Sequence, residues 1–333
     1  MEATFEIEIA AAPADVWRAL TDPEWTRRWY YDSPVTGDWR PGGAVSYRFP
    51  DGPELENGVV VEIDEPRRLA LETSFVWDDE IRAEPPHRTT WDLEAGGAGT
   101  LVRLRFDVPE AAPQAGHLLG EEGGYALKGL RLALDPAEQA RVARRDVIGE
   151  VEIRDVTAAD VDDYLHFFDD VGFEDHPEWQ GCYCAEVSLA PDDSRTVSAK
   201  RAEMAERLAD GGVTALLAYA DGGPVAWCNY GETTRLTGVM AKLGLEPGDH
   251  ERVGSIGCFV ISSQYRRHGL ARRLMEAACD RLKARGCTQV EAYPPKESTS
   301  DYPNYRGPLG MYLEAGFEPY RDAGRTQIVR RAL

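Results

Sequence analysis

A polar, highly charged segment divides the chain into two halves with different sequence patterns. The segment, DPAEQARVARRDVIGE at residues 135–150, is poor in aromatic residues and is typical of a partly helical linker. Because 333 residues exceed the usual size of one compact domain, we predict two domains, residues 1–147 and 148–333. Six of the eight tryptophans precede residue 92 and all six cysteines follow residue 181, so the halves are not a duplication.

Charge and hydropathy restrict the classes of partner. With 58 acidic against 37 basic residues, the formal net charge is −21, which disfavours nucleic acid and anionic membranes. No apolar run approaches the roughly 20 residues of a membrane span, and the N-terminus lacks the basic-then-apolar order of a secretory signal. The six cysteines form no evident disulfide framework, so we expect a reduced, cytoplasmic protein.

The first half contains short apolar segments that predict a sheet. Phe5, Ile7 and Ile9 alternate with glutamates, as in a half-buried strand, and Pro13 then opens a helix. Five further strands are predicted at Ala44–Phe49, Gly58–Ile63, Leu69–Trp77, Thr89–Leu93 and Thr100–Phe106.

A long helix closes this half. Its apolar side carries Leu127, Leu130 and Leu134. Glycine costs about 1 kcal/mol in a helix interior, so the first turns are expected to be loosened by Gly120, Gly123 and Gly124. The order of elements predicts a curved antiparallel sheet wrapped around the terminal helix, with a cavity between them.

Several segments of this half carry a family resemblance. They are IEIAAAPADVWRALTDPEWTRRWY, WRPGG, NGVVVEIDEPRRLAL and TTWDLEAGGAGTLVRLRF. Over roughly residues 3–134 they resemble the SRPBCC superfamily, in its branch of heat-shock-ATPase-activator homologues. The resemblance implies a helix-grip fold that holds a small apolar ligand or acts as a binding module. Six tryptophans either line such a cavity or simply belong to the core: Trp17, Trp25, Trp29, Trp39, Trp77 and Trp91. For Trp17 and Trp91 the core is the stronger interpretation.

The second half alternates strands and helices. Strands are predicted at Val151–Val156, Thr214–Tyr219, Pro224–Tyr230, Ser255–Ile261, Gln289–Ala292 and Gln327–Arg331, and helices at Ala158–Val171, Ser194–Asp210, Arg266–Arg285 and Leu309–Ala315. Asp221-Gly222-Gly223 predicts a hairpin turn. The pattern predicts a mixed α/β domain.

The stretch IGCFVISSQYRRHGLARRLM carries the clearest chemistry. A buried strand, Cys258–Ile261, leads through a turn into a helix, whose first N–H groups and positive dipole end favour an anion. Residues 264–286 contain seven Arg or Lys against two Asp or Glu, a local +5 in a chain of −21. The arginines are either a phosphate site or a solvated helix face. The strand–turn–helix context favours the phosphate site.

This stretch resembles the acyl-CoA-binding core of the GNAT N-acetyltransferases, through R-x-x-G-x-A and the later MYLEAGFEPY. The resemblance covers about residues 151–333 and implies acetyl-CoA as the acyl donor. It places Tyr312 as the general acid that protonates the leaving thiolate. The strand that pairs with pantetheine is Phe259, Val260 and Ile261. The loop that holds the pyrophosphate is Arg266, Arg267, His268, Gly269, Leu270, Ala271 and Arg272, with Ala271 in place of the commoner glycine.

The acyl acceptor must lose a proton before it attacks, because an amine with a pKa near ~10.4 is protonated at neutral pH. Glu291 is the first candidate for the base, or else a salt-bridged strand residue. Glu232 and Asp301 are the alternatives. The family's frequent Asn is replaced by Tyr305, in a polar insertion, PPKESTSDYPNYRGP, that should border the acceptor.

An unusual segment, WQGCYC, is predicted to form a wall of the acceptor pocket through Trp179, Cys182 and Tyr183. A metal site with His176 and Cys184 is disfavoured, because Cys-x-Cys with one histidine is not a zinc spacing.

The sequence therefore predicts an α+β chain. An N-terminal helix-grip (START-like) antiparallel sheet surrounds a C-terminal helix and is followed by a GNAT mixed α/β domain. The predicted function is acetyl-CoA-dependent N-acetylation of a small-molecule amine by direct attack on the thioester. The alternative is a non-catalytic CoA-binding sensor or a chaperone-associated binding module.

Overall fold

A computed structural model of the chain describes residues 1–49, 52–77, 79–97, 99–191, 195–246, 251–297 and 305–333. These residues form two compact units. The first comprises Met1–Val142 with Asp175–Gln180, and the second comprises Ala143–Glu174 with Gly181–Leu333. The domain boundary after residue 147 stays a prediction. Among the described residues, no helix has the length and apolarity needed to cross a bilayer.

The first unit is built on one antiparallel sheet of seven described strands, in the order β1-β7-β6-β5-β4-β3-β2. The strands are β1 (Glu2–Ile9), β2 (Val35–Gly37), β3 (Ala44–Arg48), β4 (Glu54–Asp64), β5 (Arg68–Phe75), β6 (His87–Ala95) and β7 (Thr100–Asp107). The helices are α1 (Pro13–Thr21), α2 (Pro23–Thr26), α3 (Asp79–Arg82), α4 (Pro113–Leu134) and α5 (Pro136–Val142), and Asp175–Gln180 adds the short η3 (Pro177–Trp179).

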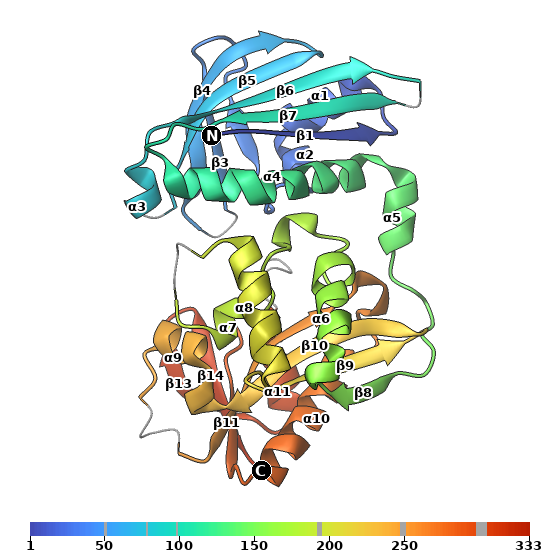
Figure 1. The fold of residues 1–333 in the computed structure, drawn as a ribbon, viewed down its shortest axis with the longest axis vertical. Helices are drawn as coiled ribbons and strands as arrows, with labels where there is room; N and C mark the ends of the chain where they lie inside the picture. The colour runs from blue at the N-terminus through green and yellow to red at the C-terminus, as the bar shows by residue number, and fades with distance from the viewer. Residues whose placement is uncertain (50–51, 78, 98, 192–194, 247–250, 298–304) are drawn as a thin grey trace. The chain divides into compact units, whose positions relative to one another are not determined.

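Helix α4 lies along the sheet beside β1 and β7 (Figure 1). Its apolar side buries Leu127 and Leu130, as predicted, in the same core as Trp29 and Trp91. The rings of those two tryptophans meet edge to face with centroids 5.8 Å apart. The predicted helix-grip arrangement is therefore confirmed, with apolar side chains packed between the sheet and the helix. The cavity predicted between them stays a prediction.

The glycines of α4 do not break it, because the helix runs without interruption from Pro113 to Leu134. At Gly123 a Cβ atom would come within 2.5 Å of a ring carbon of Phe106 and 2.7 Å of one of Phe5. Here glycine lets the helix approach the two rings, and this contact offsets its low helix propensity.

We predict that Gly123→Ala lowers the free energy of unfolding of the first domain by about 1–3 kcal/mol, because the new methyl overlaps the buried ring of Phe106 and the partly buried ring of Phe5. Gly116→Ala is the matched control, because its Cβ would lie 4.0 Å from Val108 and overlap nothing. This substitution should raise the free energy of unfolding by about 0.5 kcal/mol, because alanine has the higher helix propensity. Urea unfolding followed by tryptophan fluorescence measures both variants. Equal effects of the two substitutions would contradict the ring contact.

The second unit is built on a mixed sheet of seven described strands, in the order β13-β14-β12-β11-β10-β9-β8. The strands are β8 (Glu152–Asp155), β9 (Ala215–Ala220), β10 (Gly223–Glu232), β11 (Val253–Ile261), β12 (Gln289–Ala292), β13 (Glu318–Ala323) and β14 (Thr326–Ala332). The α-helices are α6 (Val161–His166), α7 (Ala185–Ser188), α8 (Val197–Ala209), α9 (Thr237–Leu243), α10 (Leu270–Ala284) and α11 (Leu309–Glu314). The shorter turns are η1 (Ala158–Asp160), η4 (Thr233–Arg235) and η6 (Ser263–Tyr265), and η2 (Phe167–Val171) is a π-helix.

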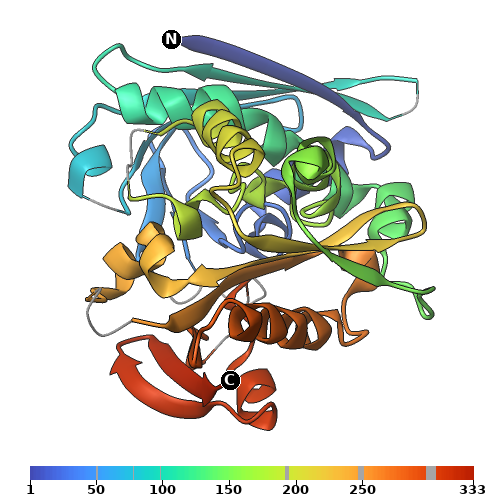
Figure 2. The ribbon, with the colours of Figure 1, turned by 60° about the horizontal axis from the view of Figure 1, so that its bottom comes forward.

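Helices cover both faces of this sheet. Alternate residues of β10 point to opposite faces, so Ala226 and Cys228 join the core under α10, while Trp227 packs on Tyr164 of α6 and Phe168 of η2. Figure 2 shows α10, in dark orange, lying along the sheet. The predicted mixed α/β architecture and the hairpin of β9 and β10 are confirmed.

The helical segment predicted at Ala158–Val171 is confirmed, and it consists of η1, α6 and the π-helix η2 in direct succession. Other predicted elements of this unit were wrong. The helix expected from Arg266 begins at Leu270, because Arg267 and Gly269 have positive φ angles of 64° and 77°. Helix α9 and strand β13 had not been predicted. The start of the predicted Ser194–Asp210 helix lies outside the described residues.

Candidate functional site

Strands β11 and β12 separate part of the way along the sheet. They pair in parallel from Val253 with Gln289 to Ile256 with Ala292. Beyond Ala292 the chain turns to β14, where Pro294 accepts a backbone hydrogen bond from Gln327 at 3.0 Å. Strand β11 continues to Ile261, paired on its other side with β10. In the part of the chain that the structure describes, no strand pairs with the β12-facing edge of Gly257–Ile261.

The loop after β11 supplies a second set of backbone donors. Arg267 and Gly269 are both left-handed, and Gly269 caps the 15-residue helix α10. The first N–H groups of a helix have no carbonyl acceptor within it, and its dipole makes this end positive. A Cβ atom on Gly269 would meet nothing within 4 Å, so space is open above the loop. The end of β11 and the start of α10 therefore form a backbone cradle that can hold an anion.

The side chains of this loop point in several directions. Arg266 donates from Nε to the carbonyl of Ile261 at 2.9 Å, and a ring nitrogen of His268 lies 2.8 Å from the carbonyl of Arg145. Arg267 and Arg272 are exposed, and Arg272 lies 3.7 Å from Glu314. Phe259 and Leu270 are buried in the core below α10, so they can serve the cradle through their backbone alone.

A buried carboxylate fixes the turn between strand and loop. Glu174, 8% exposed, accepts hydrogen bonds from the hydroxyls of Ser262 at 2.7 Å and Ser263 at 3.2 Å and from the amide of Gln264 at 3.4 Å. The sequence analysis did not identify Glu174. Its partners lie about 90 residues away, and nothing in its local pattern indicates them.

Tyr312 lies fully buried on α11. Its hydroxyl donates to the carbonyl of Arg306 at 2.8 Å, and its ring meets Phe317 edge to face at 5.1 Å. Burial raises the pKa of Tyr312 well above its usual value, and nearby cysteine sulfurs add to the shift. The hydroxyl therefore keeps its proton at neutral pH.

Glu291 lies at the point where β11 and β12 separate. It is fully buried, its Oε1 accepts from Arg330 Nε at 2.8 Å, and its Oε2 accepts from the Tyr293 hydroxyl at 3.2 Å. The Tyr293 hydroxyl also lies 2.5 Å from Ser255 Oγ, which lies 2.8 Å from Thr233 Oγ1. Burial raises the pKa of Tyr293, and the charge of Glu291 adds to the shift. Both oxygens of Glu291 are thus engaged within a hydrogen-bonded network.

Of the two other candidate bases, the structure describes Glu232. Glu232 is half-exposed and forms an ion pair with Arg235 at 3.3 Å. Asp301 and much of the polar insertion lie outside the described residues.

The residues of the predicted acceptor wall have different surroundings. Burial raises the pKa of Tyr305, and the charges of Cys182 and Cys258 add to the shift. Tyr183 is buried and donates to Asp169 at 2.6 Å, an anchoring that the sequence had not indicated. Trp179 instead stacks on His176, with centroids 3.6 Å apart, in the segment that groups with the first unit. Among the described residues, no group of three or more His, Cys, Asp or Glu side chains is placed to hold a metal ion.

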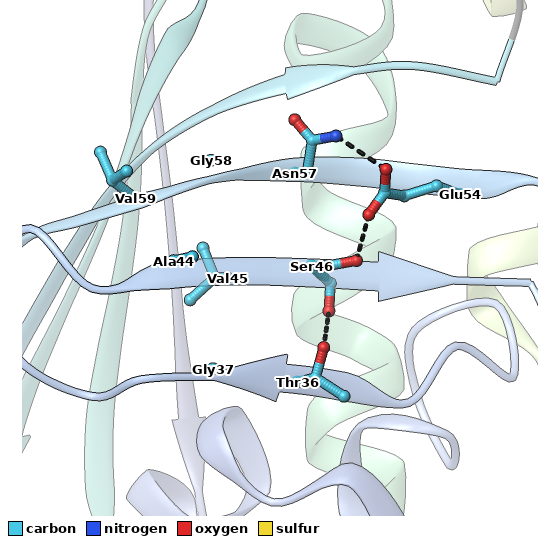
Figure 3. Close-up of a pocket in the computed structure, with 9 residues that line it drawn as sticks. All are labelled: Thr36, Gly37, Ala44, Val45, Ser46, Glu54, Asn57, Gly58 and Val59. Carbon is cyan, nitrogen blue, oxygen red and sulfur yellow. Dashed lines mark hydrogen bonds between the residues drawn. The ribbon is translucent and has the colours of Figure 1, made fainter.

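The first unit has a hollow of about 410 Å³ on the outer face of its sheet. Figure 3 shows its lining from β2, β3 and β4, where Glu54 accepts from Ser46 at 2.5 Å and from Asn57 at 2.8 Å. Ser46 pairs with Asn57 across the strands, whereas the next pair, Tyr47 with Glu56, points to the opposite face and is buried. This hollow therefore lies on the face away from α4. None of the six candidate tryptophans lines it.

The inner face of that sheet carries a buried polar cluster that the sequence analysis missed. Glu56 lies 3.4 Å from His87 and accepts from the Tyr30 hydroxyl at 3.0 Å, and His87 also lies 3.3 Å from Thr73 Oγ1. Burial, with the charge of Glu56, raises the pKa of Tyr30 well above its usual value. The available signal was the alternation of β4, which places Glu56 in phase with the buried Val60, although the predicted strand began only at Gly58.

The helix-grip sheet of the first unit and the mixed sheet of the second, with its separated strands and anion cradle, define a two-domain α+β protein. Residues 10–131 match the family of activator of Hsp90 ATPase homolog 1-like proteins. Residues 161–306 match the acetyltransferase (GNAT) family. The chain is therefore a fusion of an activator of Hsp90 ATPase homolog 1-like domain with a GNAT acetyltransferase domain.

Three solved structures to which the chain is similar each correspond to about two fifths of its length. CalU16 from Micromonospora echinospora is 23% identical, with 42% of this chain and 79% of that one covered and a TM-score of 0.33. The Aha1 dimer from Colwellia psychrerythraea is 17% identical, with 41% and 97% covered and a TM-score of 0.34. Protein CV1439 from Chromobacterium violaceum is 24% identical, with 40% and 97% covered and a TM-score of 0.33. No curated protein matches the chain.

The anchoring of Tyr183 predicts a pH dependence of stability. Burial alone would raise the pKa of Asp169, but hydrogen bonds from Arg201 and Tyr183 outweigh it and lower the pKa. The contribution of Asp169 is therefore complete above the unfolded pKa near ~3.9 and is lost as the pH falls through the lower folded value.

We predict that Asp169→Asn lowers the free energy of unfolding of the second domain by about 1 kcal/mol at pH 7, and by much less near pH 3. Calorimetry of the full chain at both pH values measures the difference. Asp170→Asn is the control, because its side chain is 67% exposed and pairs only with the exposed His166 among the described contacts. A deficit in Asp169→Asn that is the same at both pH values would refute this account.

Proposed function

We propose that the protein transfers the acetyl group of acetyl-CoA to the amine of a small molecule by direct attack on the thioester. The observation that carries the proposal is the open edge of β11 at Gly257–Ile261, which leads directly into the N-terminus of α10. An extended pantetheine arm can add to that edge as a further strand, with its pyrophosphate over the helix end. The GNAT match supports acetyltransfer, and the amine acceptor is our proposal.

The cradle suits the donor in charge as well as in shape. Arg267 and Arg272 stand exposed beside the loop, and Gly269 leaves room for a phosphate to approach the backbone. A dianionic pyrophosphate would meet N–H donors and guanidinium groups together, in a chain whose total charge is −21. We propose Phe259, Val260 and Ile261 for pantetheine and Arg266 to Arg272 for the pyrophosphate.

The reaction then needs three local functions. The amine nitrogen attacks the thioester carbonyl carbon, and a backbone N–H at Val260 or Ile261 stabilises the oxyanion that forms. When the C–S bond breaks, we propose that the protonated hydroxyl of Tyr312 donates to the leaving thiolate. The raised pKa of Tyr312 keeps the hydroxyl protonated at neutral pH, which the role requires, but it also makes this hydroxyl a weaker acid than an exposed tyrosine.

The proton lost by the amine is assigned to Glu291. Because Glu291 has no exposed surface, a proton reaches it only through a group that borders it, and Tyr293 is the hydroxyl bonded to its Oε2. A relay through Tyr293 is therefore part of the proposal. The acceptor would lie beside Cys182, Tyr183 and Tyr305, and the role of Trp179 stays a prediction.

A second candidate function is a CoA-binding module without turnover. The complete burial of both Tyr312 and Glu291 favours it, because neither side chain presents a surface to a substrate. For the first domain we propose an apolar ligand or a protein-binding role. The cytoplasmic location stays a prediction.

Calorimetric titration of acetyl-CoA, together with thiol release over a panel of small amines, separates the two candidates. We expect binding and release with at least one amine, and binding without release for any of them would leave the non-catalytic module. Within this experiment Gly269→Asp should weaken binding by at least 10-fold more than Gly269→Asn. The two side chains have the same shape and both tolerate positive φ, but the carboxylate repels a phosphate. Gly286→Asp, at the other end of α10 with φ 90° and open space, is the control for strain.

Tyr312→Phe should lower kcat by about 100-fold or more while the acetyl-CoA Kd stays unchanged, because it removes the proton donor. Tyr230→Phe is the matched control, because it also removes the hydroxyl of a buried tyrosine. That hydroxyl donates a hydrogen bond to Asp155 at 2.9 Å and has no part in the proposed chemistry. Steady-state thiol release with acetyl-CoA at saturation measures both. Equal turnover of Tyr312→Phe and the parent protein would remove Tyr312 from the mechanism.

Glu291→Gln tests the base separately. If Glu291 accepts the proton, kcat for thiol release falls in protein that is folded at the assay temperature, while the acetyl-CoA Kd stays unchanged. Lower stability with an unchanged kcat would instead assign Glu291 to the structural network alone.

A further inference from the structure

Two cysteine sulfurs of the second unit lie in direct contact. Cys184, just before α7, and Cys258, on β11, have their Sγ atoms 2.7 Å apart although 74 residues separate them. Their residues are 1% and 3% exposed. A disulfide needs a separation of about 2.05 Å, so the atoms would have to approach by about 0.7 Å.

The backbone around Cys184 is held in a costly conformation. Tyr183 and Cys184 are consecutive non-glycine residues with positive φ angles of 44° and 56°, after Gly181 at 91°. Tyr164 donates to the carbonyl of Tyr183 at 2.8 Å, and Tyr183 donates to Asp169 at 2.6 Å. Strained backbone persists where surrounding contacts over-determine it, and it is a common feature of functional positions. Here it directs the Cys184 side chain toward β11.

Helix α7 and strand β11 also pack without space between them. A Cβ atom on Gly257 would lie 2.3 Å from a methyl carbon of Val187, so only glycine fits beside α7 at that point. Residues on both sides of the sulfur contact are thus fixed by independent packing.

We propose that Cys184 and Cys258 are a redox modification site, at which a peroxide converts the two thiols into an intramolecular disulfide. One sulfur, as its thiolate, attacks an oxygen of hydrogen peroxide, and the O–O bond breaks to leave a sulfenic acid and, with the thiol proton, water. The second thiol then attacks that sulfur and expels the hydroxyl group as a second water. Two thiols and one hydrogen peroxide give one disulfide and two waters, and the peroxide takes up both electrons.

The environment makes this reaction selective for the pair but slow. Burial raises the pKa of Cys184 well above its usual value, and the neighbouring Cys258 adds to the shift. Burial also raises the pKa of Cys182 to about 12. Because the thiolate is the reactive form, prolonged exposure to peroxide is needed. The sulfenic acid, once formed, has its partner thiol in contact.

The consequence is a covalent bond between α7 and β11. Cys258 belongs to Gly257–Ile261, so oxidation would fix the backbone of the same strand whose edge remains open. The bond closes a long loop of the unfolded chain and should raise the Tm of the second domain by about 5–10 °C. This inference stands whether or not the protein catalyses acetyl transfer.

The test compares the full-length protein after dithiothreitol with the same protein after hydrogen peroxide. Remaining thiols are alkylated, and the digest is examined by mass spectrometry. We expect alkylation at all six cysteines when reduced and at four when oxidised, with a Cys184–Cys258 cross-linked peptide and a higher Tm that dithiothreitol reverses.

Variants identify the pair. Cys184→Ser and Cys258→Ser should each keep all five remaining thiols alkylated after peroxide, whereas Cys182→Ser and Cys279→Ser should still form the cross-link. Sulfinic acid without a cross-link, six alkylated cysteines after peroxide, or a cross-link that requires Cys182 would each overturn the proposal. If a serine variant does not fold, the cross-link map of the unsubstituted protein decides alone.

Discussion

The separation of β11 from β12 after Ile256 is the constraint on which the rest of the second domain depends. It is held from both sides. Strand β12 is drawn to β14 by the buried pair of Glu291 with Arg330 and by the backbone bonds between the two strands. At the point of separation Tyr293 bonds Ser255 of β11. Removing one member of such a pair leaves a buried charge without a partner, which typically costs 3–5 kcal/mol. The network therefore has a structural role whatever part it takes in proton transfer.

The open edge of β11 can bind a ligand together with the loop and helix that directly follow it in the chain. The chain leaves β11 through a turn fixed by Glu174 and enters α10 through two left-handed residues, so strand donors and helix donors lie in continuous sequence. A flexible loop here would lose the donors' orientation, and the buried carboxylate prevents that. Local basic charge complements the donors in a chain that is otherwise strongly acidic.

Local sequence patterns predicted most helices and strands, but they did not predict the contacts between residues far apart in the sequence. The alternation of Phe5, Ile7 and Ile9 and the leucines of α4 predicted their elements, because one face of each is buried. The loop at Arg266–Ala271 was found because its residues are adjacent in sequence. The pairing of Glu291 with Arg330, the turn held by Glu174, and the cluster of Glu56 with His87 join residues far apart. No periodicity indicates such pairs. The start of α10 was misplaced because a positive φ at an arginine has no sequence signal.

Amide hydrogen exchange with and without acetyl-CoA tests the central claim most directly. A donor that adds to β11 as a strand and places its pyrophosphate on α10 must protect the amides of Gly257–Ile261 and of residues 269–272. We expect exchange at these positions to slow at saturating acetyl-CoA, with the first domain unchanged. Binding that leaves both sets of amides unprotected, or protects a different strand, would contradict the account.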